Sequence, residues 1–223
     1  LTLNFVMLLK SHLESYPCPA EINFFWNFGF LLGISIIIQL VTGLLLSSHY
    51  SSDISTAYMS VQLIMREVYY GWALRYIHAN GASFVFFFVF AHMARSIFYQ
   101  SYAVSPNTWL SGVLMLIMLM ATAFMGYVLP FGQMSFWGAT VILNLLSCFP
   151  CMVEWLCGGY TVGSPTLQRF FVFHFVLPFI ICGFAVLHIF YLHSNGSNNP
   201  LGIQTNNKIP FFPYVVIKDF FGL

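Results

Sequence analysis

Four long stretches with almost no charge constrain the fold of this chain more than any other feature. They are residues 24–46, 72–99, 109–127 and 167–192. An α-helix needs roughly 20 mostly apolar residues to cross a bilayer, and each stretch meets that length. Only 6% of the chain is charged and 59% is hydrophobic, whereas soluble domains average about 25% charged residues. The sequence therefore predicts an integral membrane protein surrounded by lipid.

The lengths of these stretches also predict the fold class. Backbone polar groups in lipid must be satisfied internally, which leaves helices or closed barrels, and runs of this length favour helices. We expect an all-α membrane protein, a bundle of four antiparallel transmembrane helices. The Gly- and Pro-rich residues 128–165, between spans three and four, read as amphipathic surface or re-entrant helices. The net charge of +1 leaves no basic face for a phosphate backbone, which excludes nucleic acid as a main partner.

The distribution of Lys and Arg gives only a weak orientation. Four of these residues fall on the N-terminal side of the membrane, and Arg66, Arg75 and Arg169 fall opposite. Positive charge favours the inner side, so the N-terminus leans toward the matrix or the cytoplasm. The four basic residues on the N-terminal side are Lys10, Arg95, Lys208 and Lys218.

Histidines recur at one spacing inside the second and fourth spans. His78 and His92 are 14 residues apart, and so are His174 and His188. Fourteen residues are nearly four helical turns, so both members of a pair face one way, roughly 21 Å apart. Because these spans are parallel, His78 faces His174 and His92 faces His188. Two facing imidazoles at two levels predict two bis-histidine haems.

Glycines in the other two spans repeat the same spacing. Gly29 and Gly43 lie in the first span, and Gly112 and Gly126 in the third. A missing side chain lets a porphyrin approach a helix backbone closely. The antiparallel arrangement places Gly43 and Gly126 level with His78 and His174, and the other two glycines level with His92 and His188. Arg75 and Arg95, three residues outside the span-two histidines, are candidates to pair with haem propionates.

Simpler interpretations stay open for each residue type. A lone membrane histidine often only hydrogen-bonds a neighbouring helix, membrane glycines serve helix packing, and the arginines could be interface anchors. A zinc site is a weaker alternative, because the paired histidines are too far apart along each helix to share one metal. Cys148, Cys151 and Cys157 form a C-x-x-C-like cluster, for which buried apolar cysteine is the favoured reading over metal or redox work.

Several sequence motifs give a family resemblance. They are Trp26-Asn-Phe-Gly29, Gly71-Trp-Ala-Leu-Arg-Tyr-Ile-His-Ala-Asn-Gly-Ala-Ser83, Ala121-Thr-Ala-Phe-Met-Gly-Tyr-Val-Leu-Pro130, Gly132-Gln-Met-Ser-Phe-Trp-Gly-Ala-Thr140, Arg169-Phe-Phe, Gly196-Ser-Asn-Asn-Pro200 and Lys208-Ile-Pro-Phe. The chain resembles the N-terminal diheme half of cytochrome b, the haem-bearing subunit of mitochondrial and proteobacterial quinol:cytochrome c reductase (complex III). The resemblance implies that His78 and His174 ligate the low-potential haem, and His92 and His188 the high-potential haem. It divides the chain into a diheme bundle, residues 1–193, and an extension, residues 194–223, that borders the quinone-reduction site.

The resemblance also implies two quinone sites. Residues 132–144, with Tyr127 and Gly138 as the named positions, would form part of the quinol-oxidation site. The quinone-reduction site would be bordered by His193, Ser197, Lys218 and Asp219. Titratable groups just past a span end suit hydrogen bonding to a quinone carbonyl and proton relay, although His193 could also be an ordinary interfacial histidine.

Two departures from the family pattern matter. Phe131 stands where the family commonly has Trp. The C-terminal half of the family, with its Pro-Glu-Trp-Tyr loop and four further spans, is absent. Quinol oxidation would therefore be incomplete on this chain alone. Either a second polypeptide supplies that half, or the sequence is part of a longer protein; both explanations stay open.

Together these features predict an electron-transfer subunit of a translocating quinol:cytochrome c reductase in the mitochondrial inner membrane, with a bacterial inner membrane as the less favoured location. Expected partners are an iron–sulfur protein and a cytochrome c-type subunit, in a dimeric complex. Two rivals remain: a stand-alone diheme membrane anchor of a quinone-linked dehydrogenase, and a non-haem membrane scaffold or channel. A reduced-minus-oxidised spectrum distinguishes the scaffold or channel from the haem proteins, because the scaffold would lack b-type bands.

Overall fold

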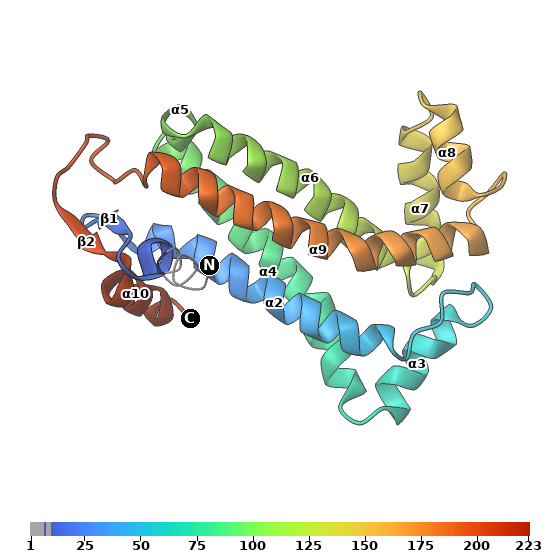
Figure 1. Ribbon diagram of the computed structural model, residues 1–223. Coiled ribbons are helices and arrows are strands. Elements are labelled where there is room, and N and C mark those ends of the chain that lie inside the picture. The colour runs from blue at the N-terminus through green and yellow to red at the C-terminus, as the bar shows by residue number, and fades with distance from the viewer. Residues whose placement is uncertain (1–6, 8–9) are drawn as a thin grey trace. The chain divides into compact units, whose positions relative to one another are not determined.

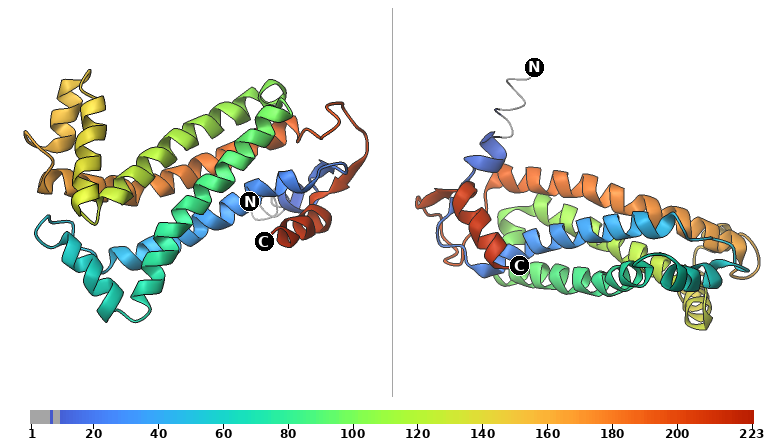
Figure 2. Two further views of the ribbon diagram at one scale, coloured as in Figure 1. Left: turned by 180° about the vertical axis from the view of Figure 1, so that it is seen from behind. Right: turned by 90° about the horizontal axis from the view of Figure 1, so that it is seen from below.

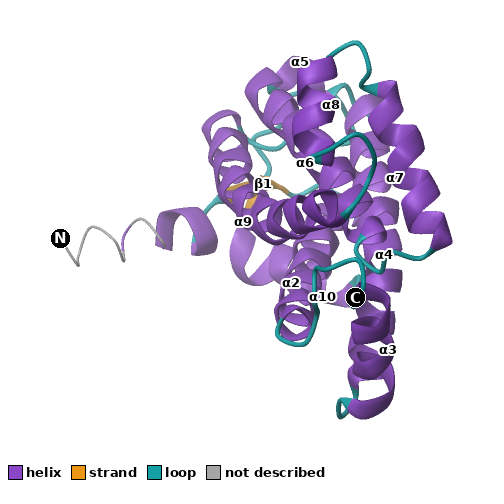
Figure 3. Ribbon diagram, turned by 90° about the vertical axis from the view of Figure 1, so that its right-hand side faces the viewer, coloured by secondary structure: helices purple, strands orange, loops and turns teal. Residues whose placement is uncertain are grey.

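Helices make up most of the computed structural model, which describes Met7 and residues 10–223 (Figure 3). In this part of the chain, four helical segments are long and apolar enough to cross a membrane. The predicted all-α membrane fold with four transmembrane helices is confirmed. The segments are η2–α2 (Phe24–Asn27 and Phe28–Ser47), α4 (Gly71–Phe98), α6 (Pro106–Val128) and α9 (Ser164–Asn195), of which the α-helices are labelled in Figure 1.

The helix ends differ from the predicted spans by up to three residues. α6 begins at Pro106 instead of 109, and α9 begins at Ser164, directly before Pro165, instead of 167. A proline fits the first turn of a helix because its missing N–H has no partner there in any case. Hydropathy alone therefore places these two starts too late.

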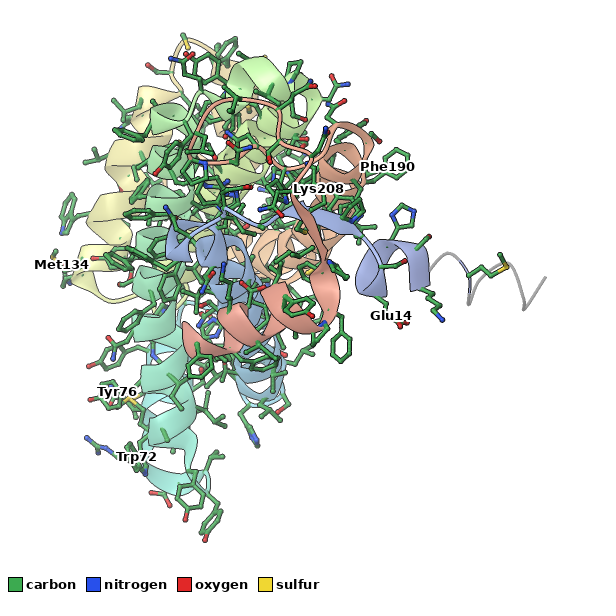
Figure 4. All side chains as sticks on the ribbon, turned by 90° about the vertical axis from the view of Figure 1, so that its left-hand side faces the viewer. Glu14, Trp72, Tyr76, Met134, Phe190 and Lys208 are labelled. Carbon is green, nitrogen blue, oxygen red and sulfur yellow. The ribbon has the colours of Figure 1, made fainter. Side chains whose placement is uncertain are left out.

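Large apolar side chains project outward from the long helices. Figure 4 labels Trp72 and Tyr76 on α4 and Phe190 on α9, and each of these side chains is more than half exposed. Soluble proteins rarely leave contiguous apolar surfaces of this extent uncovered. Lipid would cover these side chains in a membrane.

The chain divides into two compact units, and every long helix contributes one segment to each of them. The first unit comprises residues up to Ile36, Ser83–Leu116 and Gly183–Leu223. The second comprises Ile37–Ala82 and Ile117–Cys182. The division at residue 193 that the sequence suggests stays a prediction.

In the first unit, the segment before span one pairs with the C-terminal segment. Strand β1 (Pro17–Pro19) runs antiparallel to β2 (Lys208–Pro210), with Cys18 opposite Ile209. A small core of Tyr16, Cys18, Ile22 and Val215 joins the two segments. The remaining elements of this unit are π-helices η1 (Lys10–Glu14) and η3 (Phe211–Val215) and helices α5 (Ser101–Val104) and α10 (Val216–Phe221).

In the second unit, helices α7 (Gln133–Leu145) and α8 (Pro150–Cys157) lie side by side in both Figure 1 and Figure 2. They are the predicted helices between spans three and four. α3 (Ala57–Glu67) fills the loop after span one. The Tyr50 hydroxyl donates to the Leu129 carbonyl at 2.5 Å, which ties that loop to the end of α6. The buried core of this unit is Ala57, Met125, Val128, Ala139, Leu143, Cys157, Val162, Leu167 and Phe170.

Candidate functional site

The four span histidines face each other in pairs across α4 and α9. In the second unit the ring centroids of His78 and His174 are 6.1 Å apart, with an angle of 80° between the ring planes. In the first unit those of His92 and His188 are 6.3 Å apart, at 53°. A ring nitrogen lies about 1 Å from its centroid and a metal–imidazole bond is about 2 Å long, so two imidazoles on opposite sides of one metal have centroids roughly 6 Å apart. Both pairs have this spacing.

Hydrogen bonds at Nδ1 fix the tautomer of three of these histidines. Nδ1 of His78 lies 2.9 Å from Oγ1 of Thr42, and Nδ1 of His188 lies 2.9 Å from Oγ of Ser111. Each hydroxyl donates its own proton to a backbone carbonyl, of Ile38 and Thr108 respectively. The hydroxyls must therefore accept from the histidines, so Nδ1 carries the proton and Nε2 keeps its lone pair.

His174 reaches the same tautomer through the backbone. Its Nδ1 lies 2.8 Å from the Thr122 carbonyl oxygen, which can only accept a hydrogen bond. Metal-bound histidines typically donate their other N–H to such an acceptor, which orients the ring and makes the ligand more basic. In all three cases Nε2 is the nitrogen left for a metal.

His92 differs from the other three. Nη2 of Arg95 lies 3.3 Å from its Nδ1, and a guanidinium can only donate. Nδ1 therefore accepts in this arrangement. A metal at Nε2 would require Arg95 to release Nδ1, and an anionic group beside Arg95 would favour that change. Nε of Arg95 is buried and has no hydrogen-bond partner among the described residues, so the guanidinium has capacity for such a group.

The four glycines make room for the four histidine rings. A Cβ added at Gly43 would lie 3.0 Å from Cε1 of His78, and one at Gly126 would lie 2.8 Å from Nδ1 of His174 and still closer to Cε1. Those at Gly29 and Gly112 would lie 3.2 Å from Cε1 of His92 and His188. Real Cβ atoms rarely approach so closely. Each glycine thus lets one histidine ring lie against a helix backbone.

This donor set fits a haem better than a bare metal ion. In the part of the chain that the structure describes, no group of three or more His, Cys, Asp or Glu side chains could hold a metal. Among the described residues, each level offers two imidazoles and no third ligand. A porphyrin brings the other ligands of its own iron, so the two imidazoles at each level would suffice to hold a haem. Arg75 lies one turn before His78 on α4, and Arg95 lies over the Trp26 ring at 5.1 Å.

The expected quinone-reduction residues gather in the first unit around Tyr16. The His193 ring stacks on Tyr16, with centroids 3.9 Å apart. Burial raises the pKa of the Tyr16 hydroxyl, which also interacts with the backbone of Ser197. Asp219 is buried on α10, and burial raises the pKa of its carboxyl to about 6. Burial raises the pKa of the Cys18 thiol to about 11, and the charge of Asp219 adds to that rise.

Lys218 is held by the backbone beside the same group. Its Nζ donates to the Ile22 carbonyl at 2.8 Å, and the Lys218 carbonyl accepts from the Asn27 side chain at 2.8 Å. Asn27 is buried at the start of span one. α10 is therefore fastened to the start of span one.

The two named quinol-oxidation residues are neighbours in the second unit. A Cβ at Gly138 on α7 would lie 3.6 Å from Cε1 of Tyr127 on α6, in ordinary contact. The Ser135 hydroxyl donates to the Tyr127 carbonyl at 3.0 Å. More than half of the Tyr127 side chain is exposed. Of the cysteines between spans three and four, Cys157 is buried, whereas Cys148 and Cys151 are exposed.

Sequence reasoning missed the partners of the histidines. Thr42 and Ser111 directly precede Gly43 and Gly112, so a hydroxyl residue before these two glycines was the available signal. The carbonyl of Thr122 gave no signal, because every residue has one. His12, whose ring nitrogen lies 3.1 Å from that of His193, is 181 residues away in sequence and was also missed.

Comparisons with known proteins show which family the chain belongs to. Residues 13–196 match the family described as Cytochrome b/b6/petB. The chain belongs to the cytochrome b family. Cytochrome b of Plasmodium chabaudi is 55% identical over 219 residues, which are 98% of this chain and 58% of that protein. Cytochrome b of Plasmodium falciparum is 54% identical over 217 residues, 97% of this chain and 57% of that protein.

A solved structure of a hyperthermophilic respiratory Complex III contains a similar fold. It matches 97% of this chain and 61% of its own chain, with a TM-score of 0.89 and 30% sequence identity. The chain therefore has the helical membrane fold of a complex III cytochrome b, and it spans a little more than half the length of the curated relatives it matches.

Proposed function

We propose that this chain is the diheme, electron-transferring part of the cytochrome b subunit of a quinol:cytochrome c reductase. His78 and His174 would hold the low-potential haem, and His92 and His188 the high-potential haem. The observation that carries the proposal is the pairing of imidazoles across α4 and α9, three of which donate from Nδ1 and so leave Nε2 for iron. Family membership supports the same assignment.

When bound, two b-type haems supply one-electron chemistry at two depths of the membrane. The chain's own residues place them and adjust their environment. Thr42, Ser111 and the Thr122 carbonyl orient the imidazoles and increase their basicity. Arg75 and Arg95 would pair with propionates, and the glycines would give the porphyrin room beside the helices.

Quinone chemistry would take place in both units. Tyr127 and Gly138 would form part of the quinol-oxidation site. His193, Ser197, Lys218 and Asp219 would border the quinone-reduction site, where a quinone takes up two electrons and two protons. Asp219 suits proton donation there, since burial brings the pKa of its carboxyl to about 6 and general acids work best near the ambient pH.

Oxidation and reduction of quinone on opposite sides would couple electron transfer to proton translocation. The expected partners are an iron–sulfur protein and a cytochrome c-type subunit, in a dimeric complex of the mitochondrial inner membrane. The rest of the family's length, with the Pro-Glu-Trp-Tyr loop, would complete the oxidation site.

The reduced-minus-oxidised spectrum of the purified complex tests this proposal. We expect two b-type haems per copy of this chain. His188→Leu should remove one and spare much of the other, while His49→Leu, at an exposed histidine outside the spans, should retain both. Absence of b-type bands in the parent would favour the scaffold or channel. Two haems with no dependence on an iron–sulfur or cytochrome c partner would favour the dehydrogenase anchor.

A further inference from the structure

His12 and His193 are joined by a hydrogen bond between equivalent ring nitrogens. Their Nδ1 atoms are 3.1 Å apart. The ring planes differ by only 5°, and the centroids are 5.3 Å apart. Since the nitrogens are so much closer than the centroids, the rings meet edge to edge in nearly one plane. This is the direction in which an imidazole donates or accepts a hydrogen bond.

A bond between two Nδ1 atoms constrains the protons of the pair. One Nδ1 must carry a proton and the other must offer a lone pair. In the neutral pair, the ring that donates has a bare Nε2, and the ring that accepts has a protonated Nε2. One end of the pair can therefore take up a proton while the other end releases one.

The surroundings fix this geometry. Tyr16, which is buried, covers one face of the His193 ring, and its hydroxyl lies 3.5 Å from the Leu192 carbonyl. His12 and His193 are each half-buried, so the pair joins the aqueous surface to the buried group around Tyr16. The other ionisable groups on the packed elements are Lys10 and Glu14 on η1, Cys18 on β1, Lys208 on β2, Tyr214 on η3, and Lys218 and Asp219 on α10.

We propose that His12 relays protons from water through His193 to the quinone-reduction site. This inference rests on the proposed function, which places a quinone oxygen at His193. His12 is a positioning and relay residue, because it acts through His193 and does not contact the quinone.

The step balances in protons and charge. His12 accepts a proton from water at Nε2 and passes its Nδ1 proton to Nδ1 of His193. His193 then releases its Nε2 proton to the reduced quinone oxygen. The pair is again neutral, with both tautomers exchanged. This passage supplies one of the two protons of quinone reduction, and Asp219, the proton donor of the proposed site, would supply the other; the electrons would come from the haem held by His92 and His188.

Two substitutions separate relay from orientation. In His12→Asn the side-chain amide can still hydrogen-bond Nδ1 of His193, but an amide cannot take up and pass on a proton. His12→Ala removes both functions and leaves space for free imidazole. His49→Asn is the matched control, since His49 is an exposed histidine outside this group.

The measurement uses the assembled complex that contains this chain, with quinol oxidation blocked. The rate at which quinone reoxidises the pre-reduced haem is followed between about pH 5.5 and pH 8.5, the range in which histidine titrates, in water and in heavy water. We expect His12→Asn and His12→Ala both to slow reoxidation at least about tenfold above pH 7, because a lost proton-transfer group typically costs that much or more. The quinone concentration that gives the half-maximal rate should stay unchanged, and the solvent isotope effect should grow. Added imidazole should restore the reoxidation rate of the His12→Ala protein.

Two results would overturn the relay. One is a His12→Asn protein with the rate and pH profile of the parent, which would make His12 an orienting residue only. The other is a His12→Ala protein whose haem reoxidation is slow, does not respond to imidazole and has an unchanged solvent isotope effect, while the quinone concentration that gives the half-maximal rate is raised. Failure of the proposed function looks different, because the parent complex itself would then show no quinone-dependent haem reoxidation.

Discussion

The hydroxyl of Thr42 accepts a hydrogen bond from Nδ1 of His78 at 2.9 Å while it donates its own proton to the Ile38 carbonyl. The histidine therefore cannot carry its only proton on Nε2 without losing this bond. A side chain on one span thus sets which nitrogen of a histidine on another span is available to iron. Thr122 does the same for His174 with its backbone carbonyl.

This difference gives the first prediction. Thr42→Val removes the acceptor, so His78 becomes a less basic ligand, and iron(II) is favoured over iron(III). Loss of such a partner changes metal affinity about 10–100-fold, and a tenfold change corresponds to about 59 mV for one electron. We expect the midpoint potential of one b-type haem to rise by tens of millivolts in a redox titration.

Thr122→Val is the matched control. The Thr122 hydroxyl donates to the Met118 carbonyl at 2.7 Å, and the carbonyl that serves His174 remains after the substitution. The potentials should stay at the parent values. Equal shifts in the two variants would mean that the threonines act through helix packing and not through the histidine bond.

The second prediction concerns the fit of Gly126 against His174. An alanine Cβ would lie 2.8 Å from Nδ1 of the histidine, so Gly126→Ala should displace the ring. Alanine favours a helix by about 1 kcal/mol over glycine, so the helix itself should not suffer. We expect the haem content, measured by extraction, to fall from two to one per chain.

A glycine with open surroundings provides the comparison for that experiment. A Cβ at Gly183 on α9 would meet nothing within 4 Å among the described residues. Gly183→Ala should keep both haems. Two haems retained with unchanged spectra in Gly126→Ala would show that this close approach has no part in cofactor binding.

The spans and the histidine levels were predictable because they depend on periodicity within one segment. Charge-free length defines a span, and a spacing of 14 residues places His78 and His92 on one face. The β1–β2 pairing and the His12–His193 contact depend on residues almost 200 positions apart. Short polar segments such as η1 carry no hydropathy pattern that selects a partner, so those contacts required the structure.

The third prediction is a pH dependence from Asp219. Burial raises the pKa of its carboxyl from 3.8 to about 6. The folded state therefore holds the proton more tightly than the unfolded state, and this contribution to stability is present below pH 3.8 and lost as the pH rises through about 6. A protonated-carboxyl infrared band should titrate near pH 6 and be missing from Asp219→Asn.

Asp53 supplies the control with the opposite sign. Hydrogen bonds from the Ser55 side chain and backbone lower the pKa of the Asp53 carboxyl, so it should be ionised throughout that range. Asp53→Asn should leave the band near pH 6 intact. A band that survives in Asp219→Asn would assign it to another carboxyl and remove the proton donor from the proposed site.

The fourth prediction is a test of topology with thiols. Three candidate spans separate Cys18 from the exposed Cys148 and Cys151 in the sequence, and an odd number of crossings predicts that the two ends lie on opposite faces of the membrane. A membrane-impermeant maleimide added to sealed, oriented vesicles should label Cys148 and Cys151 from the face opposite the N-terminus. Cys18 should resist labelling from either face until the protein is unfolded. It is buried, and the pKa of its thiol is raised to about 11, whereas the thiolate is the reactive form.

The double variant Cys148→Ser with Cys151→Ser is the control. It should abolish the rapid labelling and leave the slow reaction unchanged. The contrary result would be rapid labelling of the parent from the N-terminal face that disappears in this double variant. It would require an even number of spans before α8. The four-helix assignment, on which both haem levels depend, would then be wrong.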